Sequence, residues 1–272
     1  MNIKSENIVT ITLISLSIIL YFVGFYFREI SNGAAHTDFQ LHIWLLINDF
    51  EKDYIGTLKN YLTYKEATFP FYHSIQSILN PFKSNYLSFA FSNTILNLFI
   101  LYIFYYFLKK KIFLNNFNFS ILLLPFIFLL SPWFRSTSFW STTENFALFF
   151  LIPACYYLFL LIKDQDNYKT NFLLTLFISL TIYSRQQFLF LALTHIAILT
   201  ISGDYKKLLN TLIYYFFLSL PGIYTYYLWG VFSDLNNATS ASSYISLQNI
   251  FINIPKISTL IFFYLTPVFL IN

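Results

Sequence analysis

The sequence predicts an all-α fold, a polytopic bundle of transmembrane helices. Three observations lead to this fold class. The 272 residues are 57% hydrophobic and only 10% charged, a composition typical of membrane proteins. Apolar runs long enough to cross a bilayer recur along the whole chain. Lysines occur in alternate short segments between these runs, as they do in cytoplasmic loops of membrane proteins.

The apolar runs define the expected helices in order. A helix needs roughly 20 apolar residues to cross about 30 Å of hydrocarbon, because each residue rises ~1.5 Å. The long runs cover residues 8–27, 86–108, 117–133, 145–162, 208–228 and 250–271. Between them, the polar stretch "SRQQ" at 184–187 separates two shorter runs, 171–183 and 188–201. We interpret these as a hairpin of two short, tilted helices, which gives about eight crossings.

The positive charges indicate which side of the membrane each loop faces. Basic groups lie at Lys4, Lys109–Lys111, Lys163 with Lys169, and Lys206–Lys207. They share the cytoplasmic side only if the 171–201 stretch crosses twice. The outer side then receives residues 28–85, 133–145, 184–187 and 229–249.

We therefore expect residues 1–272 to form a single transmembrane domain with an extracytoplasmic loop at 28–85. The chain stops directly after its last apolar run, so we expect the protein to continue beyond it. The net charge of +4 comes from scattered basic residues and does not predict a nucleic-acid partner. Cys155 stands alone, which excludes an internal disulfide and a thiolate metal cluster.

The segment "NGAAHTDFQLH" at 32–42 places titratable groups directly after the first membrane helix. The mixture of apolar and polar residues at 39–46 predicts a helix lying at the membrane surface. On that helix Asp38 and His42 are four residues apart and share a face, with His36 close by. The alternative is that Asp38 only caps the helix. The lysines of the loop, Lys65 among them, also fit a solvated face or contacts with lipid headgroups.

Charged residues near the outer membrane boundary form a second group of candidates. Arg135, Glu144 and Arg185, followed by Gln186, lie in or beside apolar runs. Charges there are costly unless they are paired or face a wet cavity, so they indicate a functional site. The alternative is a structural ion pair between Glu144 and either Arg135 or Arg185. His195, in the middle of an apolar run, is more typical of a hydrogen-bonded core residue.

This layout resembles the GT-C superfamily of polytopic glycosyltransferases. The nearest resemblance is to the dolichyl-phosphate-glucose α-1,2-glucosyltransferases, through "DFQLH" (Asp38, His42), "FPFYH" (Pro70, Tyr72) and "SRQQ" (Arg185, Gln186). Phe39 stands where that family has a second acid, and this chain is much shorter than members of that family. The resemblance implies a sugar donor linked to a polyprenyl phosphate, a lipid-linked or glycan acceptor, and a site on the outer or lumenal face. It makes Asp38 the essential acid of the first outer loop.

Such a transfer requires a base for the acceptor hydroxyl and cations for the departing phosphate. Asp38 supplies the first, and Arg135, Arg185 or Lys65 the second, so that neither a metal nor a cofactor is needed. The predicted catalytic residues are Asp38 and His42, and the predicted substrate-binding residues are His36, Lys65, Arg135, Glu144, Arg185 and Gln186.

Two other functions fit the same residues. A transporter or flippase would use the arginines to hold a lipid-linked or anionic solute, although its typical inverted repeats are not visible here. A non-catalytic assembly subunit would use the outer loop to bind a partner. In each case we expect a multi-pass protein of the plasma (inner) membrane or the endoplasmic reticulum membrane, surrounded by membrane lipids.

Overall fold

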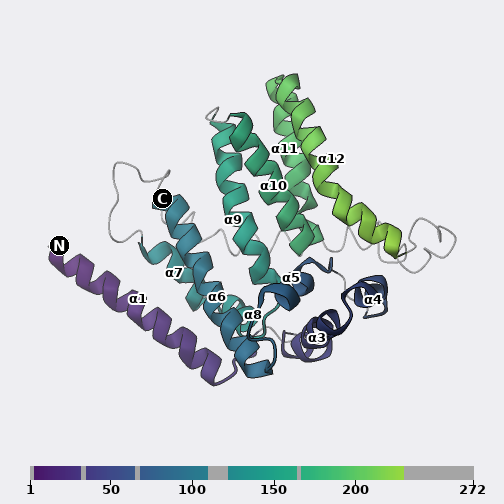
Figure 1. Ribbon diagram of the computed structural model, residues 1–272. Coiled ribbons are helices and arrows are strands. Elements are labelled where there is room, and N and C mark those ends of the chain that lie inside the picture. Colours follow the sequence, from purple (N-terminus) through teal and green to yellow (C-terminus); the bar gives the residue numbers. More distant parts are fainter. Residues whose placement is uncertain (1–2, 32–34, 65–67, 110–121, 164–166, 230–272) are drawn as a thin grey trace, which may run out of the picture. The chain divides into compact units, whose positions relative to one another are not determined.

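The computed structural model describes residues 3–31, 35–64, 68–109, 122–163 and 167–229. Every regular element in these ranges is a helix, which confirms the all-α class (Figure 1). Residues 1–225 form one compact unit, and the description below concerns that unit. The predicted outer loop at 229–249 and the predicted crossing at 250–271 lie almost wholly outside the described residues.

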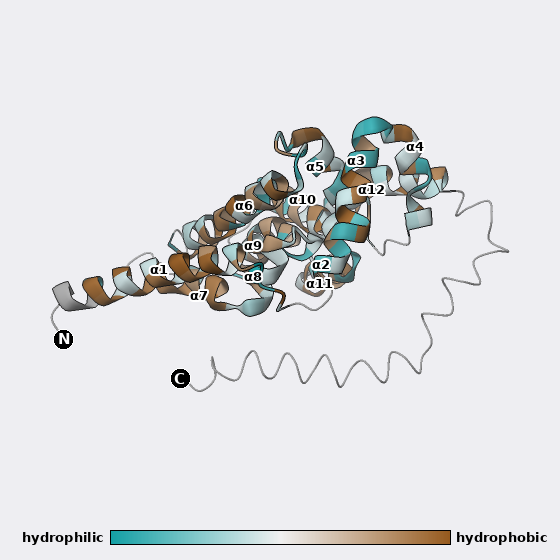
Figure 2. Ribbon diagram, turned by 90° about the horizontal axis from the view of Figure 1, so that it is seen from below, coloured by the Kyte–Doolittle hydropathy of each residue, from teal (hydrophilic) through white to brown (hydrophobic). Residues whose placement is uncertain are grey.

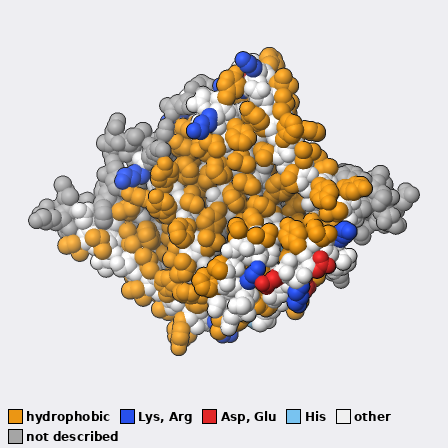
Figure 3. All heavy atoms as spheres, viewed as in Figure 1, with side chains coloured by type: hydrophobic (Ala, Val, Ile, Leu, Met, Phe, Trp, Pro, Cys, Tyr) orange, Lys and Arg blue, Asp and Glu red, His pale blue; other side chains and the backbone are white. Residues whose placement is uncertain are grey.

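Four helices of the described residues are candidates to span the membrane. They are α1 (Ile3–Tyr26), α6 (Tyr86–Phe107), α9 (Thr143–Ile162) and α12 (Tyr205–Leu228). Each is long and apolar enough to cross a bilayer, α1 from Asn7 onward. Their exposed hydrophobic side chains cover much of the face in Figure 3, with charged side chains at its margins. The chain is therefore a helical membrane protein with four candidate membrane-spanning helices in its described part.

The count of about eight crossings is not confirmed. Within the predicted crossing 117–133, the described part forms only α7 (Leu123–Leu130), and the extended backbone at Ser131 then separates it from α8 (Pro132–Phe139). These eight residues alone are too few to span about 30 Å of hydrocarbon, and residues 117–121 of the predicted crossing lie outside the described residues. Proline favours the first turn of a new helix, and Pro132 begins α8 here.

The predicted break at "SRQQ" is confirmed. The first predicted half is α10 (Tyr168–Ser184) and the second is α11 (Leu189–Ser202), joined by the short 3₁₀ turn η5 (Gln186–Phe188). Arg185 has extended backbone angles, φ −152° and ψ 106°, which end α10. Gly203 ends α11 with φ 73°, a conformation that glycine adopts without steric cost.

The long loop after α1 is helical, as predicted. It contains α2 (Ala35–Asp38), the π-helical turn η1 (Phe39–Ile43), α3 (Trp44–Lys52), α4 (Tyr54–Lys59), the 3₁₀ turn η2 (Tyr61–Tyr64) and α5 (Phe71–Leu79). Because the residues at both junctions of η1 keep helical backbone angles, 35–52 is one continuous helix with a widened turn. Figure 2 shows many hydrophilic residues on α3 and α4, whereas α1 and α7 are mainly hydrophobic.

Aromatic and aliphatic side chains hold these elements together. Helix α1 packs against α7, α6 against α9, α9 against α10, and α3 against α5. A core around Tyr21, Phe39, Phe89 and Trp140 joins the loop helices to α1, α6 and α8. Tyr21 is fully buried and donates a hydrogen bond to the carbonyl oxygen of Thr94, 2.9 Å away.

The chain direction gives the bundle two chemically different ends. Helices α1 and α10 finish, and α6, α9 and α11 start, at the end where α5 and α8 lie (Figure 1). We call this the polar end. The opposite end, which we call the lysine end, carries Lys109, Lys163 and Lys206–Lys207. The polar end thus collects the described parts of 28–85, 133–145 and 184–187, which the sequence predicts to lie on the outer side.

Candidate functional site

The helix that carries Asp38 is fixed to the polar end through aromatic contacts. The His36 ring meets the Trp140 ring edge to face, with 4.4 Å between centroids. The buried Phe39 ring lies 5.4 Å from that of Tyr86 and 6.1 Å from that of Trp140. Offset and edge-on aromatic pairs at such distances are favourable. Segment 35–39 is therefore anchored to the start of α6 and the end of α8.

Asp38 is exposed and does not cap its helix. The helix starts at Ala35, which places Asp38 in the first turn, and the Asp38 side chain accepts no capping hydrogen bond from the segment after it. The capping alternative therefore receives no support. The backbone bond from Trp44 N–H to the Phe39 carbonyl spans five residues and creates a π turn directly after Asp38. Such single π turns inside helices are frequent at functional sites.

His42 lies near enough to a second histidine, His73 on α5, to affect its pKa. His73 is fully buried, and its Nδ1 lies 3.1 Å from the hydroxyl of Tyr61. Burial lowers the pKa of His73 to about 3, and the nearby charge of His42 lowers it further. His73 is thus neutral at physiological pH. Sequence reasoning did not place His73 in the site, and its position in "FPFYH" beside Pro70 and Tyr72 was the available signal.

Arg135 is held by an acid that the sequence analysis did not consider. Its Nη2 donates to Glu29 Oε1 at 3.0 Å, and both side chains are only about one-fifth exposed. The indole Nε1 of Trp140 donates to the Glu29 carbonyl oxygen, also at 3.0 Å. These bonds tie the chain just after α1 to the middle of α8 and to Trp140, directly after its last residue. Arg135 therefore already has a carboxylate partner.

Glu144 forms an ion pair with Arg185, one of the two pairings that the sequence left open. Glu144 sits in the first turn of α9, where the helix dipole favours a negative charge. Gln186 follows the pair, is half-buried and begins η5. The ion pair therefore joins the start of α9 to the break between α10 and α11.

The corner between α8 and α9 is rich in buried polar atoms. Ser141 has a positive φ of 51°, and its carbonyl oxygen accepts a hydrogen bond from the Tyr72 hydroxyl at 2.6 Å. Asn145 Nδ2 donates to the Phe134 carbonyl and the Ser138 hydroxyl. Four buried oxygens of this corner lack a hydrogen-bond partner within the described ranges: Ser141 Oγ, Thr142 Oγ1, Glu144 Oε2 and Asn145 Oδ1. Groups of this kind call for water, an ion or a ligand.

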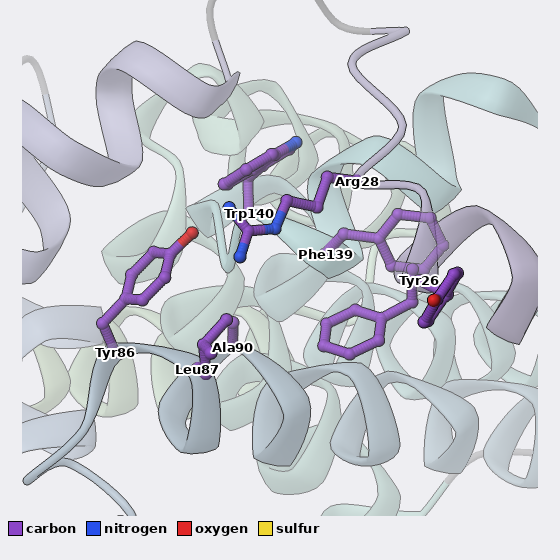
Figure 4. Close-up of a pocket in the computed structure, with 8 residues that line it drawn as sticks. Tyr26, Arg28, Tyr86, Leu87, Ala90, Phe139 and Trp140 are labelled. Atoms are coloured by element: carbon purple, nitrogen blue, oxygen red, sulfur yellow. The ribbon is translucent and has the colours of Figure 1, made fainter.

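A pocket of about 260 Å³ opens beside this corner, at the junction of α1, α6 and α8 (Figure 4). It is lined by Phe25, Tyr26, Arg28, Tyr86, Leu87, Ala90, Phe139 and Trp140. The Arg28 guanidinium lies 6.0 Å from the centre of the Tyr86 ring, within cation–π range. Sequence reasoning missed Arg28, although a basic residue directly after the first membrane run was a visible signal.

The structure thus brings most predicted site residues to the polar end, but in separate contacts. His36 meets Trp140, His42 lies near His73, Arg135 holds Glu29, and Arg185 holds Glu144. Within the described ranges, no ion pair joins Asp38 to an arginine. Lys65 lies outside the described residues.

Comparisons with protein-family models, with curated proteins and with solved structures gave no match for this chain.

Proposed function

We propose that this chain is an integral membrane glycosyltransferase of the GT-C type. It transfers a sugar from a polyprenyl-phosphate donor to a lipid-linked or glycan acceptor on the outer or lumenal face of the plasma (inner) or endoplasmic reticulum membrane. One observation carries the proposal. The exposed Asp38, the histidine pair, both arginine–glutamate pairs and the orphaned polar oxygens of 141–145 all lie at one end of a membrane bundle.

The proposed reaction assigns the base to Asp38. Its exposed carboxylate takes the proton of the acceptor hydroxyl as that oxygen bonds to the anomeric carbon of the sugar. The bond between that carbon and the phosphate oxygen breaks, and the phosphate leaves with its electron pair. His42, one turn further along the helix, orients the acceptor, and His36 contributes to the sugar subsite beside Trp140.

The departing phosphate needs positive charge. Arg135, Arg185 and Lys65 are the proposed contacts, with Glu144 and Gln186 beside Arg185. Arg135 and Arg185 each hold a glutamate in this structure, so each would exchange or share that partner when a phosphate arrives. The topology of about eight crossings, with the polar end outside, belongs to this proposal.

The test is transfer of labelled sugar from a panel of polyprenyl-phosphate donors by the purified chain in liposomes. Asp38→Asn keeps the size of the side chain and removes its basicity. We expect turnover to fall by about two to four orders of magnitude, the usual worth of general-base catalysis. Near wild-type turnover by this variant would refute the assignment.

Asp53→Asn is the matched control. Asp53 is another exposed carboxylate of the same loop, and it caps α4 by accepting a hydrogen bond from the Gly56 amide at 2.9 Å. Asparagine caps helices about as well as aspartate. We therefore expect Asp53→Asn to keep both its fold and its transfer rate.

The break at Arg185 favours one other candidate, a transporter or flippase for a lipid-linked or anionic solute. Transporters often bind substrates where a membrane helix is interrupted, and Arg185 lies between α10 and α11. In that case labelled lipid-linked solute would cross the liposome membrane without transfer of sugar, and Asp38→Asn would leave the flux unchanged.

A further inference from the structure

Arg28 differs from the other two arginines of the chain in its partners. Arg135 and Arg185 are each neutralised by a glutamate. Glu29, the direct neighbour of Arg28, is turned away and binds Arg135 and the Ser31 hydroxyl. Within the described ranges, no carboxylate pairs with Arg28, whose guanidinium instead lies over Tyr86. A full positive charge is therefore available in the pocket.

The backbone at Arg28 is held in an unfavourable conformation. Its φ of 52° lies in the left-handed region, which is uncommon for residues other than glycine. The Arg28 amide donates to the Phe25 carbonyl at the end of α1, a position where helices often use glycine. Such strain is stored mainly at functional sites. The conformation directs the side chain into the pocket.

The pocket combines this charge with apolar walls. In Figure 4 the guanidinium lies beside Trp140, and the Tyr86 hydroxyl points toward it. The remaining walls are aromatic and aliphatic side chains from α1, α6 and α8. An anion bound there would contact the guanidinium and the phenol, while an attached hydrocarbon would lie against the walls. Guanidinium groups bind phosphate oxygens strongly because two N–H groups can donate in parallel.

The pocket also lies at the level where a lipid headgroup would sit. One candidate membrane-spanning helix ends at Tyr26 and another begins at Tyr86. Tyr26 and Leu87, on the rim, are 79% and 48% exposed, so the opening is flanked by side chains suited to the bilayer interface. A ligand with an apolar chain could enter from the membrane.

We propose that the Arg28 pocket binds an ester phosphate carried on an apolar chain. Two sources share this chemistry, a polyprenyl phosphate and a phospholipid headgroup. If the bound phosphate belongs to the sugar donor, this site is part of the proposed function and rests on it. Phe39, next to Asp38, contacts both Tyr86 and Trp140 of the pocket, which links the two sites.

The binding test uses the purified full chain in detergent, with farnesyl phosphate as the probe and farnesol as its uncharged counterpart. Arg28→Gly removes the charge and suits the positive φ, so the variant should fold at least as stably as the natural chain. We expect its affinity for farnesyl phosphate to fall about tenfold to a hundredfold, the effect of losing a charge-assisted hydrogen bond. Farnesol binding should not change.

Lys163→Gln is the matched control, because Lys163 Nζ lies 4.5 Å from the centre of the Phe159 ring at the lysine end. It should bind farnesyl phosphate normally. Unchanged affinity of Arg28→Gly, or an equal loss in Lys163→Gln, would overturn the site.

A second experiment distinguishes a polyprenyl phosphate from a phospholipid headgroup. It measures farnesyl phosphate binding to the chain in nanodiscs of phosphatidylcholine, with or without phosphatidylglycerol. Displacement of farnesyl phosphate by phosphatidylglycerol supports a headgroup site, and retention supports a polyprenyl-phosphate site. Asp38→Asn should bind the probe normally. A chain that binds farnesyl phosphate through Arg28 but transfers no sugar would refute the proposed function and leave this site intact.

Discussion

The two ends of the bundle differ in how their charged side chains are paired and exposed. At the polar end, Arg135 and Arg185 are paired with glutamates, and each of these side chains is only about one-fifth exposed. At the lysine end, Lys163 lies over an aromatic ring at an exposed position. Lys207 is 22% exposed and pairs with the more exposed Asp204 one helical turn away. Removing charges from water costs free energy, whereas an exposed lysine such as Lys163 costs little.

This difference is the reason for placing the site of the proposed function at the polar end. An end that only anchors the protein needs basic residues in water near the headgroups. The polar end also buries hydrogen-bonding groups of α5, α8 and α9, among them His73, Ser141 and Asn145. Several of their atoms lack partners within the described ranges. We therefore interpret the polar end as the working end and the lysine end as the anchor.

The largest expected effect is on stability at the polar end. Glu144→Gln removes the carboxylate that binds the partly buried Arg185. Breaking a buried pair costs about 3–5 kcal/mol, and we expect the lower end of this range because both side chains are partly exposed. Thermal or denaturant unfolding in detergent measures the loss. Lys163→Gln, at the lysine end, should stay within about 0.5 kcal/mol of the natural chain.

A double variant sharpens this test. Glu144→Gln combined with Arg185→Gln removes both charges, and we expect it to be more stable than Glu144→Gln alone. If Glu144→Gln and Lys163→Gln cost the same, the contrast between the two ends does not hold.

A smaller effect concerns the pH dependence of stability at His73. Burial lowers its pKa to about 3, whereas an unfolded histidine titrates near 6.5. Between these values the unfolded chain binds a proton that the folded chain does not. This contribution to stability is therefore fully present above pH 6.5 and is lost as the pH falls toward 3, by about 1.4 kcal/mol per pH unit.

Unfolding of the natural chain and of His73→Gln between pH 7.5 and 5 measures this contribution. We expect the natural chain to lose about 2 kcal/mol through His73 over this range, and His73→Gln to lose that much less. The groups near His73 are His42 and Tyr61, so His42→Gln controls for the neighbouring charge. Identical pH profiles for the natural chain and His73→Gln would contradict the assignment.

Much of the fold follows from patterns within single segments. Apolar runs of sufficient length predict α1, α6, α9 and α12, because the bilayer imposes both composition and length. The break at "SRQQ" was also visible, since a charged group in an apolar run must find a partner or water. In the run at 117–133, hydropathy alone did not reveal that Ser131 and Pro132 start a new helix.

The site was harder to predict, because its contacts join residues far apart in sequence. Nothing local in "FREIS" shows that Glu29 turns to Arg135 while Arg28 turns to Tyr86. The choice between Arg135 and Arg185 as partner of Glu144 likewise depends on how α8, α9 and α10 pack. These pairings depend on tertiary packing, which cannot be read from the periodicity of the sequence.

The account depends on the polar end facing outward, and substituted-cysteine labelling tests this most directly. In a Cys155→Ala background, Asn60→Cys marks the loop after α4, and Lys163→Cys marks the end of α9. Both positions are exposed. We predict that a membrane-impermeant maleimide labels position 60 in intact cells or sealed, correctly oriented vesicles, and position 163 only after permeabilisation. Labelling of both positions from the same side, or of position 163 alone from outside, would contradict the account.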